Sequence, residues 1–285
     1  MTTCRRLQCV LVISLLFLIV PASLQAQMTK QIYTGMFGAW AYDSVDAALQ
    51  LMKNNGFQLA VVNTYHLDKA QQYGLKGIVA FSLTKDMATD DTKWKEFLDT
   101  LRTSISRYKN HPAVFAWYPI DEPELQGIPI DKVKTVSNLI KSIDQNHPIF
   151  TVMNKPDLWV KYLPYFDVIA EDKYLDYATN TPEVIRGSIK KLKADLKSLN
   201  MNKPVWAVIG ALDLKKRVGS SSYHKPTSEE FNQMVDIALQ EGAAGILVYT
   251  IAFKNNPLFL DWNLPKDDAV LWEIVRQLPQ YLKKR

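Results

Sequence analysis

The sequence is nearly free of cysteine, with two residues in 285, and both of them, Cys4 and Cys9, lie at the N-terminal end. The rest of the chain therefore cannot form a disulfide or use a thiol as nucleophile or metal ligand. Histidine is scarce too, and none of the four residues shows the His-x-His or His-Glu-x-x-His spacing of a transition-metal site. We expect neither a metal centre nor a cofactor.

Motifs of two large enzyme classes are also absent. The sequence has no Gly-x-Ser-x-Gly nucleophile elbow and no Walker-type phosphate loop. Charge of either sign is in small excess only, since 34 Lys and Arg against 29 Asp and Glu give a net charge of +5. That balance is too mild and too dispersed to favour a nucleic-acid partner. Composition leaves the oligomeric state open.

One long hydrophobic run stands near the N-terminus. Two arginines precede an apolar stretch over residues 9–20, and small residues follow it. This layout is typical of a secretory signal peptide, and the run is shorter than the about 20 residues that cross a bilayer as a helix. We predict a signal peptide over residues 1–26, cleaved after Ala26 or after Ala22. The protein would then be secreted or periplasmic, with no stable membrane insertion after cleavage; a retained N-terminal anchor is the alternative.

After this segment the chain alternates between short apolar runs and longer amphipathic, charged stretches. The expected strands cover residues 32–40, 57–65, 75–83, 113–120, 148–154, 166–174, 204–212 and 243–253. The expected helices cover residues 43–55, 67–73, 92–109, 131–144, 158–163, 182–199, 228–240 and 266–281. Strict alternation indicates parallel strands joined by crossover helices.

Eight such units predict a single α/β domain, a (β/α)8 TIM barrel over residues 27–285, because this fold needs about 250 residues. A doubly wound open sheet is the alternative architecture. It usually has fewer strands and often a Gly-rich phosphate turn after the first one, and no such turn is present here.

The sharpest chemical signal is the segment WYPIDEPEL at the end of the fourth expected strand. The active site of a TIM barrel lies at the carboxyl ends of its strands. Asp121 and Glu122 stand at such an end, and Pro123 stops the strand directly after them. The apolar residues before them would raise a carboxyl pKa, as a general acid near neutral pH requires. We predict Glu122 as the catalytic acid and Asp121 as its support, with capping of the next loop as the alternative role.

Glycoside cleavage generally needs a second carboxyl group. Asp172, at the end of the sixth expected strand, is the preferred candidate. Glu171 is its alternative, because adjacent residues of a strand point to opposite sides and one of the two is expected to enter the cleft. Asp213 and Asp261 are weaker candidates. The alternative role of Asp172 is structural, in an ion pair with Lys173 or another neighbour in the barrel.

Polar and aromatic side chains converge on the same ends of the strands, which is the mixture that binds sugar hydroxyls and stacks on the apolar face of a pyranose. We predict these substrate-binding residues: Trp40, Tyr65, His66, Asp121, Asn154, Tyr174, Tyr249 and Trp262.

Several of these segments resemble a known group. RYKNHPAVFAWYPIDEPEL is similar to the fourth strand of barrel glycoside hydrolases that carry Asn-Glu-Pro or Asp-Glu-Pro there, and FDVIAEDKY resembles their sixth strand. PVWAVIGAL and GILVYTIAF resemble their seventh and eighth strands. The resemblance implies that Glu122 is the acid/base. Many retaining members carry a nucleophilic Glu at the end of the seventh strand, where this chain has no acid before Asp213.

We therefore predict a secreted glycoside hydrolase that acts on an oligo- or polysaccharide by carboxylate acid/base catalysis. The alternative is a non-catalytic carbohydrate-binding barrel that has lost the seventh-strand nucleophile; substrate-assisted cleavage would also tolerate the loss. The basic residues 215–217 could select acidic sugars or form a solvated loop. A barrel lyase or aldolase has little support, since Lys173 is the nearest candidate for a Schiff-base lysine.

Overall fold

The computed structural model describes residues 31–175, 181–213, 225–253 and 262–285. Eight parallel strands form one sheet in the order β4-β3-β2-β1-β8-β7-β6-β5. The strands are β1 (Tyr33–Met36), β2 (Leu59–Val62), β3 (Lys76–Ala80), β4 (Val114–Tyr118), β5 (Phe150–Met153), β6 (Val168–Asp172), β7 (Val205–Gly210) and β8 (Gly245–Tyr249). The two end strands meet through a parallel bridge between Trp117 and Ile149, beside a hydrogen bond from the Trp117 N–H to the Pro148 carbonyl at 2.9 Å. The predicted (β/α)8 TIM barrel is confirmed.

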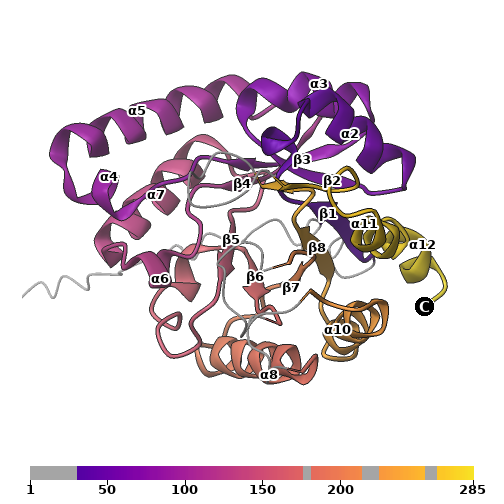
Figure 1. Cartoon of the computed structure of the whole chain (residues 1–285). Helices are drawn as coiled ribbons and strands as arrows, with labels where there is room; N and C mark the ends of the chain where they lie inside the picture. The colour runs from indigo at the N-terminus through magenta and orange to yellow at the C-terminus, as the bar shows by residue number, and fades with distance from the viewer. Residues whose placement is uncertain (1–30, 176–180, 214–224, 254–261) are drawn as a thin grey trace, which may run out of the picture.

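Helices surround this ring of strands, as Figure 1 shows. They are α2 (Val45–Asn54), α3 (Leu67–Gln72), α4 (Lys85–Thr89), α5 (Asp91–Tyr108), α6 (Pro123–Gln126), α7 (Ile130–Ile143), α8 (Glu183–Ser198), α10 (Ser228–Gln240), α11 (Ala269–Arg276) and α12 (Leu278–Lys283). Short 3-10 turns are η1 (Ala39–Ala41), η2 (Thr64–His66) and η3 (Leu163–Tyr165), and a small hairpin pairs β9 (Ala252–Phe253) with β10 (Trp262–Asn263).

Side-chain caps explain where many of these helices begin. Before α2, α4, α5, α10 and α11, a side chain accepts a hydrogen bond from an N–H of the first turn, and the capping residues are Ser44, Thr84, Asp90, Thr227 and Asp268. Thr227 and Glu230 complete a reciprocal capping box. Each long helix turns one apolar stripe to the strands, such as Phe97, Leu101 and Ile105 of α5.

Several expected strands are shorter in the structure, and the short helices α4 and α6 were not expected; three differences change the type or number of elements. The first strand ends at Met36 instead of residue 40, because Gly38 takes a left-handed φ of 84° and starts η1, which carries Trp40. Residues 158–163 form turns that lead into η3 instead of a helix. The last helix is two helices, α11 and α12. The second begins with Leu278 and Pro279, and a proline cannot donate the backbone hydrogen bond that would continue the first.

Strand residues alternate between two apolar clusters. In β6, Val168 and Ala170 pack inside the barrel, whereas Ile169 belongs to the layer between strands and helices. Trp206 fills much of the interior, and Gly245 makes room for it, since a Cβ on that glycine would lie 2.3 Å from the indole ring. Because the interior is packed with side chains, the barrel leaves room for a ligand only at its mouth.

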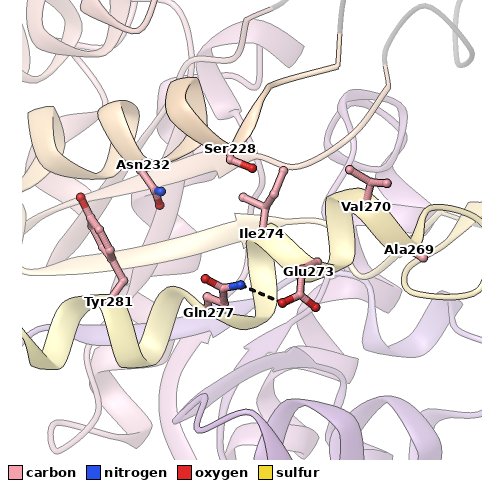
Figure 2. Close-up of a pocket in the computed structure, with 8 residues that line it drawn as sticks. All are labelled: Ser228, Asn232, Ala269, Val270, Glu273, Ile274, Gln277 and Tyr281. Atoms are coloured by element: carbon pink, nitrogen blue, oxygen red, sulfur yellow. Dashed lines mark hydrogen bonds between the residues drawn. The ribbon is translucent and has the colours of Figure 1, made fainter.

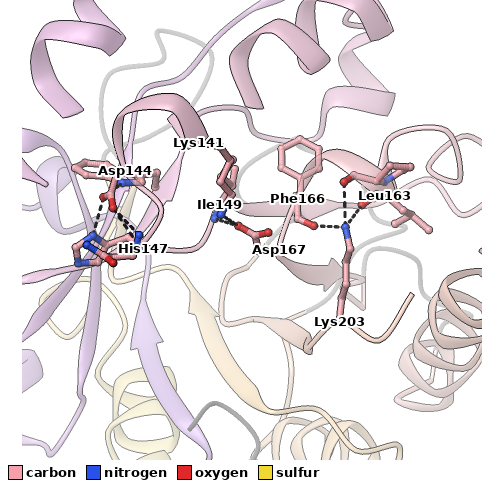
Figure 3. Close-up of polar contacts among 11 residues, drawn as sticks. Lys141, Asp144, His147, Ile149, Leu163, Phe166, Asp167 and Lys203 are labelled. Carbon is pink, nitrogen blue, oxygen red and sulfur yellow. Dashed lines mark hydrogen bonds and ion pairs between the residues drawn. The ribbon is translucent and has the colours of Figure 1, made fainter. Parts of the chain in front are cut away.

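Polar groups tie the strands together at the opposite, amino end of the barrel (Figure 3). The half-buried Lys203 side chain donates to the carbonyls of Leu163, Pro164 and Phe166, and desolvation of its ammonium group lowers the pKa of this lysine to about 8. Asp144 accepts from the Trp117 indole at 2.8 Å and binds His147 at 2.7 Å. These contacts hold loops in place at the face where TIM barrels carry stability instead of catalysis.

No helix among the described residues has the length and apolarity needed to span a bilayer. In the same part of the chain, no group of three or more His, Cys, Asp or Glu side chains could hold a metal ion. The predicted signal peptide, residues 1–26, lies outside the described residues.

Candidate active site

A cavity of about 360 Å³ opens at the carboxyl ends of the strands. Strands β3 to β8 contribute to its wall, together with residues that follow β1, β3, β4 and β6. The lining residues are Phe37, Trp40, Ala80, Ser82, Tyr118, Asp121, Glu122, Val152, Asp172, Tyr174, Val208 and Tyr249. The cavity therefore combines three carboxyl groups with an aromatic wall at the place where barrel enzymes bind their substrates.

Glu122 reaches this cavity from a strained backbone position. Its φ and ψ of 42° and 56° lie in the left-handed region, which is uncommon outside glycine. The Glu122 N–H donates to the Val152 carbonyl of β5 at 3.1 Å, and the Glu122 carbonyl accepts from the Gln126 N–H at 3.0 Å. Ser82, which also lines the cavity, has a positive φ of 56°. Strain of this kind persists where surrounding contacts hold it, and it clusters at functional sites.

Asp121 lies at the outer edge of the cavity and keeps contact with solvent. Its carboxylate accepts a short hydrogen bond from the Tyr118 hydroxyl. Desolvation of its carboxyl group raises the pKa of Asp121, and the hydrogen bond from Tyr118 opposes this rise. The Gln126 side chain donates to the Asp121 backbone carbonyl at 2.5 Å. These contacts hold Asp121, which follows β4, beside Glu122.

Asp172 enters the cavity from the end of β6 and is almost fully buried. One carboxyl oxygen, Oδ2, accepts from the Tyr174 hydroxyl at 2.9 Å, whereas the buried Oδ1 has no hydrogen-bond partner in the described structure. Burial raises the pKa of Asp172, the negative charge of Glu122 raises it further, and the Tyr174 hydrogen bond opposes both. The protein therefore binds one oxygen of this carboxyl group, and the other is shielded from solvent without a partner among the described residues.

Glu171 faces the other way. It is fully buried, does not line the cavity, and lies near Ser188 of α8, in the layer between the strands and the helices. Its two oxygens make no hydrogen bond of good geometry, so the Ser188 hydroxyl offsets only part of the burial that raises the pKa of Glu171 to about 8. Of the two adjacent acids, the structure brings Asp172 and not Glu171 to Glu122.

The end of β7 carries no carboxyl group. Gly210 is its last residue and pairs with Tyr249 of β8. A Cβ on Gly210 would lie 2.8 Å from Cδ1 of the Tyr174 ring, so this ring occupies the space that a side chain would need. Tyr174 in turn stacks on Tyr249, with ring centroids 5.7 Å apart and planes 15° apart. Asp213 is described but does not line the cavity, and Asp261 lies outside the described residues.

Four of the predicted substrate-binding residues line the cavity, and these are Trp40, Asp121, Tyr174 and Tyr249. Three do not. Tyr65 is 75% exposed on η2, and His66 beside it packs against the Tyr65 ring with Nδ1 buried and without a partner. Asn154 lies behind the wall, where its amide donates to the Asp172 carbonyl at 2.8 Å. Of Trp262, only its place in β10 is described.

Lys173 forms a hydrogen bond with Asn154, and this contact bears on two predicted roles: Asn154 as a substrate-binding residue and Lys173 as a Schiff-base lysine. The Lys173 ammonium donates to the Asn154 side-chain oxygen at 2.9 Å and does not line the cavity. Lys173 is therefore poorly placed to form a Schiff base with a molecule in the cavity. Together with the amide that holds the Asp172 backbone, this contact supports the end of β6 from outside.

Sequence reasoning missed Phe37 and Tyr118 in the cavity wall. Tyr118 follows Ala116 by two positions on β4 and so shares its inward face. Phe37 lies four residues after Tyr33, one position beyond β1, and therefore points to the same inward side. Strand alternation could therefore have found both aromatics. Ser82 lies at the end of the third expected strand, and a backbone turn after β3 brings it into the wall.

A second cleft, of about 370 Å³, lies outside the barrel between α10 and the pair α11 and α12. Figure 2 shows its side chains, among which Glu273 is the one acid. That carboxylate accepts from Gln277 at 2.8 Å and forms an ion pair with Arg276 at 2.5 Å. With its one carboxylate already paired and no second acid in its wall, this cleft lacks the groups for glycoside cleavage.

Comparisons with known proteins agree with the geometry. Residues 44–236 match the family described as "Glycosyl hydrolases family 2, TIM barrel domain". Among curated proteins, the chain is 25% identical to a beta-glucuronidase of Mus musculus over 177 residues, which are 55% of this chain and 26% of that protein. It is 28% identical to a probable mannan endo-1,4-beta-mannosidase A-1 of Aspergillus terreus over 121 residues, or 39% of this chain and 30% of that protein. The chain thus spans less than a third of either relative.

Solved structures share the fold. The endo-1,4-beta-D-mannanase of Thermotoga petrophila superposes with a TM-score of 0.63 at 14% identity, over 88% of this chain and 99% of that chain. The beta-galactosidase of Marinomonas ef1 superposes with a TM-score of 0.67 at 12% identity, over 88% of this chain and 60% of that chain. Likeness at such identities establishes the shared barrel and no more.

Proposed function

Because the chain belongs to the glycosyl hydrolase family 2 TIM barrel domains, we propose that it hydrolyses O-glycosidic bonds of an oligo- or polysaccharide. Glu122 serves as the proton donor and Asp172 as the second carboxyl group. The observation that carries this proposal is the cavity at the mouth of the barrel, where two acids from different strands line one space. Two carboxyl groups in one sugar-sized cavity are what glycoside hydrolysis requires.

The proposed chemistry assigns one proton to each acid. Glu122 gives its proton to the glycosidic oxygen as the bond from that oxygen to the anomeric carbon breaks. Water supplies the hydroxyl group of the new hemiacetal, and its remaining proton goes to Asp172. Burial and the nearby negative charge raise the pKa of Asp172, which makes its carboxylate a stronger base than an exposed aspartate. The products are a free sugar hemiacetal and an alcohol.

Aromatic side chains provide the sugar-binding surface in this proposal. Tyr174 and Tyr249 present a stacked pair in the cavity wall, and Trp40 stands at its edge with 44% of its surface exposed. A half-exposed indole beside a cavity offers an apolar plane on which a pyranose ring can stack. Trp40 therefore supports binding of a sugar unit that extends beyond the cavity.

Export remains part of the proposal. The layout of residues 1–26 supports a signal peptide that is removed on secretion or transfer to a periplasm. Sequencing the N-terminus of the protein recovered from the extracellular or periplasmic fraction tests it. Recovery of an intact N-terminus in the cytoplasmic fraction would reject export.

A panel of aryl glycosides and polysaccharides tests the activity. The names of the relatives suggest beta-glucuronides, beta-mannosides, beta-galactosides and mannan as the first substrates. Glu122→Gln should lower kcat by about a thousandfold while ligand binding persists, because loss of a general acid costs about 10² to 10⁴ in rate. Glu229→Gln is the matched control, since Glu229 is exposed on α10. Equal rates for the two variants would reject the role of Glu122.

The second candidate is a carbohydrate-binding barrel without turnover. Gly210 favours it, because the end of β7 lacks the carboxyl that many retaining relatives use. Calorimetry and turnover measured on the same glycans separate the candidates. Micromolar binding of a sugar together with no hydrolysis after prolonged incubation would favour the binding protein.

A further inference from the structure

The end of β7 shows how this barrel differs from one with a seventh-strand carboxyl. Gly210 pairs with Tyr249, and a Cβ at position 210 would lie 2.8, 3.0 and 3.2 Å from three carbon atoms of Tyr174. Even alanine would therefore displace the tyrosine. The glycine and the ring are complementary, since the absence of one side chain provides the room for the other.

Tyr174 is held in this space from two sides. Its ring stacks on Tyr249 at 5.7 Å between centroids, and Tyr249 also contacts the Phe37 ring at 5.8 Å. Its hydroxyl donates to Oδ2 of Asp172 at 2.9 Å. The ring position thus determines where the hydroxyl lies, and the hydroxyl determines how the carboxyl of Asp172 is turned.

Asp172 is restrained at its backbone as well. The Asn154 amide donates to its carbonyl at 2.8 Å, and β6 pairs Asp172 with Val208 of β7. With the backbone and Oδ2 held, the buried Oδ1 is the oxygen of this carboxyl that has no partner among the described residues. It belongs to a side chain that lines the cavity.

We propose that Tyr174, seated over Gly210, is a positioning residue that holds the Asp172 carboxyl group at the wall of the cavity that Glu122 also lines, so that the end of β6 supplies the carboxyl that β7 lacks. This inference rests on the proposed function. Tyr174 acts through Asp172 and takes no covalent part in the reaction. Gly210 leaves space for the Tyr174 ring, and Tyr249 stacks on that ring and supports it.

The proposal predicts a specific change in pH dependence. The titratable groups that interact with the charge of Asp172 are Glu122 and Asp121, which follow β4, Tyr118 of β4, Tyr174, and Glu171, its neighbour on β6. Among them, Tyr174 is the group whose hydrogen bond lowers the pKa of Asp172, while the acids raise it. Removing that hydroxyl should therefore move the Asp172 pKa upward.

Tyr174→Phe is the direct test, because it keeps the ring over Gly210 and removes only the hydroxyl. We expect kcat to fall at least about tenfold with little change in KM, and the acidic limb of the kcat/KM profile to move to higher pH. Tyr73→Phe, which removes a hydroxyl that donates to Asp46 on the outside of the barrel, should leave that limb in place. If both variants keep the wild-type limb, the positioning role is wrong.

Gly210→Ala tests the same contact from the other side. Its added methyl group should displace Tyr174 and lower kcat, in a protein that circular dichroism and thermal unfolding show to be folded. The double variant with Tyr174→Phe should lose little more than either single variant, because both act through one hydrogen bond. Additive losses would overturn the proposal.

The outcomes also separate this inference from the proposed function. If Glu122→Gln and Asp172→Asn abolish turnover while Tyr174→Phe changes neither kcat nor the limb, the hydrolase assignment stands and the positioning role fails. If the wild-type protein hydrolyses no glycoside, the proposed function fails. Carboxyl ¹³C NMR titration of Asp172 then tests the contact alone, and an Asp172 pKa equal in wild type and Tyr174→Phe overturns it.

Discussion

Glu171 offers a stability test of how the end of β6 is arranged. The carboxyl is fully buried behind the barrel wall and has a pKa raised to about 8, mainly by burial. In the unfolded chain it would titrate near its ordinary value of 4.5. Between these two values the folded protein binds a proton that the unfolded chain has lost. The free energy of unfolding is therefore highest below about pH 4.5, where Glu171 is protonated in both states, and it falls as the pH rises toward about 8.

The size of the effect follows from the shift. One pKa unit corresponds to about 1.4 kcal/mol, so a rise from 4.5 to about 8 is worth about 5 kcal/mol over the whole range. Glu171→Gln replaces the titrating group by a neutral one of similar shape. The variant should match the wild type to within about 1 kcal/mol near pH 5 and be more stable by about 5 kcal/mol near pH 9.

Urea unfolding at about pH 5, 7 and 9 measures this difference, with m-values compared to confirm that the same surface unfolds. Glu229→Gln on the exposed face of α10 should show no such pH-dependent gap. A stability difference between wild type and Glu171→Gln that is the same at all three pH values would refute the reasoning. The variant should also keep turnover, since Glu171 does not line the cavity.

Three further predictions concern the base, the interior and the rim of the barrel. Burial raises the pKa of Asp144, but hydrogen bonds led by His147 lower it to about 2. Thermal unfolding should therefore show stability lost as the pH falls from about 4 to about 2, and Asp144→Asn should remove much of that dependence. Gly245→Ala should lower the free energy of unfolding by about 1 to 3 kcal/mol or more, measured in urea, because the methyl group would meet Trp206 at 2.3 Å. Trp40→Ala should raise KM for a polysaccharide more than for a small aryl glycoside in steady-state assays, because the half-exposed indole lies at the cavity edge.

Much of the fold followed from pattern alone. Eight apolar runs alternating with amphipathic stretches predicted the barrel, and the helix expected over 228–240 matches Ser228–Gln240. The errors share one cause, which is local backbone geometry. Gly38 ends the first strand early through a positive φ, and Pro279 divides the last helix. Such breaks depend on one residue in its setting and leave little trace in hydrophobic periodicity.

The candidate site was partly predictable for a related reason. The ends of strands can be located from sequence, so Glu122, Asp172, Tyr174 and Tyr249 were all expected at the mouth, where the structure places them. Tyr65 and Asn154 are also near strand ends, yet the first points to solvent and the second supports β6 from behind. Position along the chain does not determine the direction of a side chain in a loop. Whether any of these residues acts in catalysis stays a prediction.

By itself, the sequence determined the number and order of the strands, because burial of alternating apolar segments is a local property that repeats along the chain. It also determined that an acid pair follows the fourth strand and that the seventh strand ends without one. Only the tertiary structure decided which of two adjacent acids on β6 faces the cavity and what occupies the space over Gly210. Those facts depend on the register between neighbouring strands and on side chains from distant segments packing into one volume, which no single segment specifies.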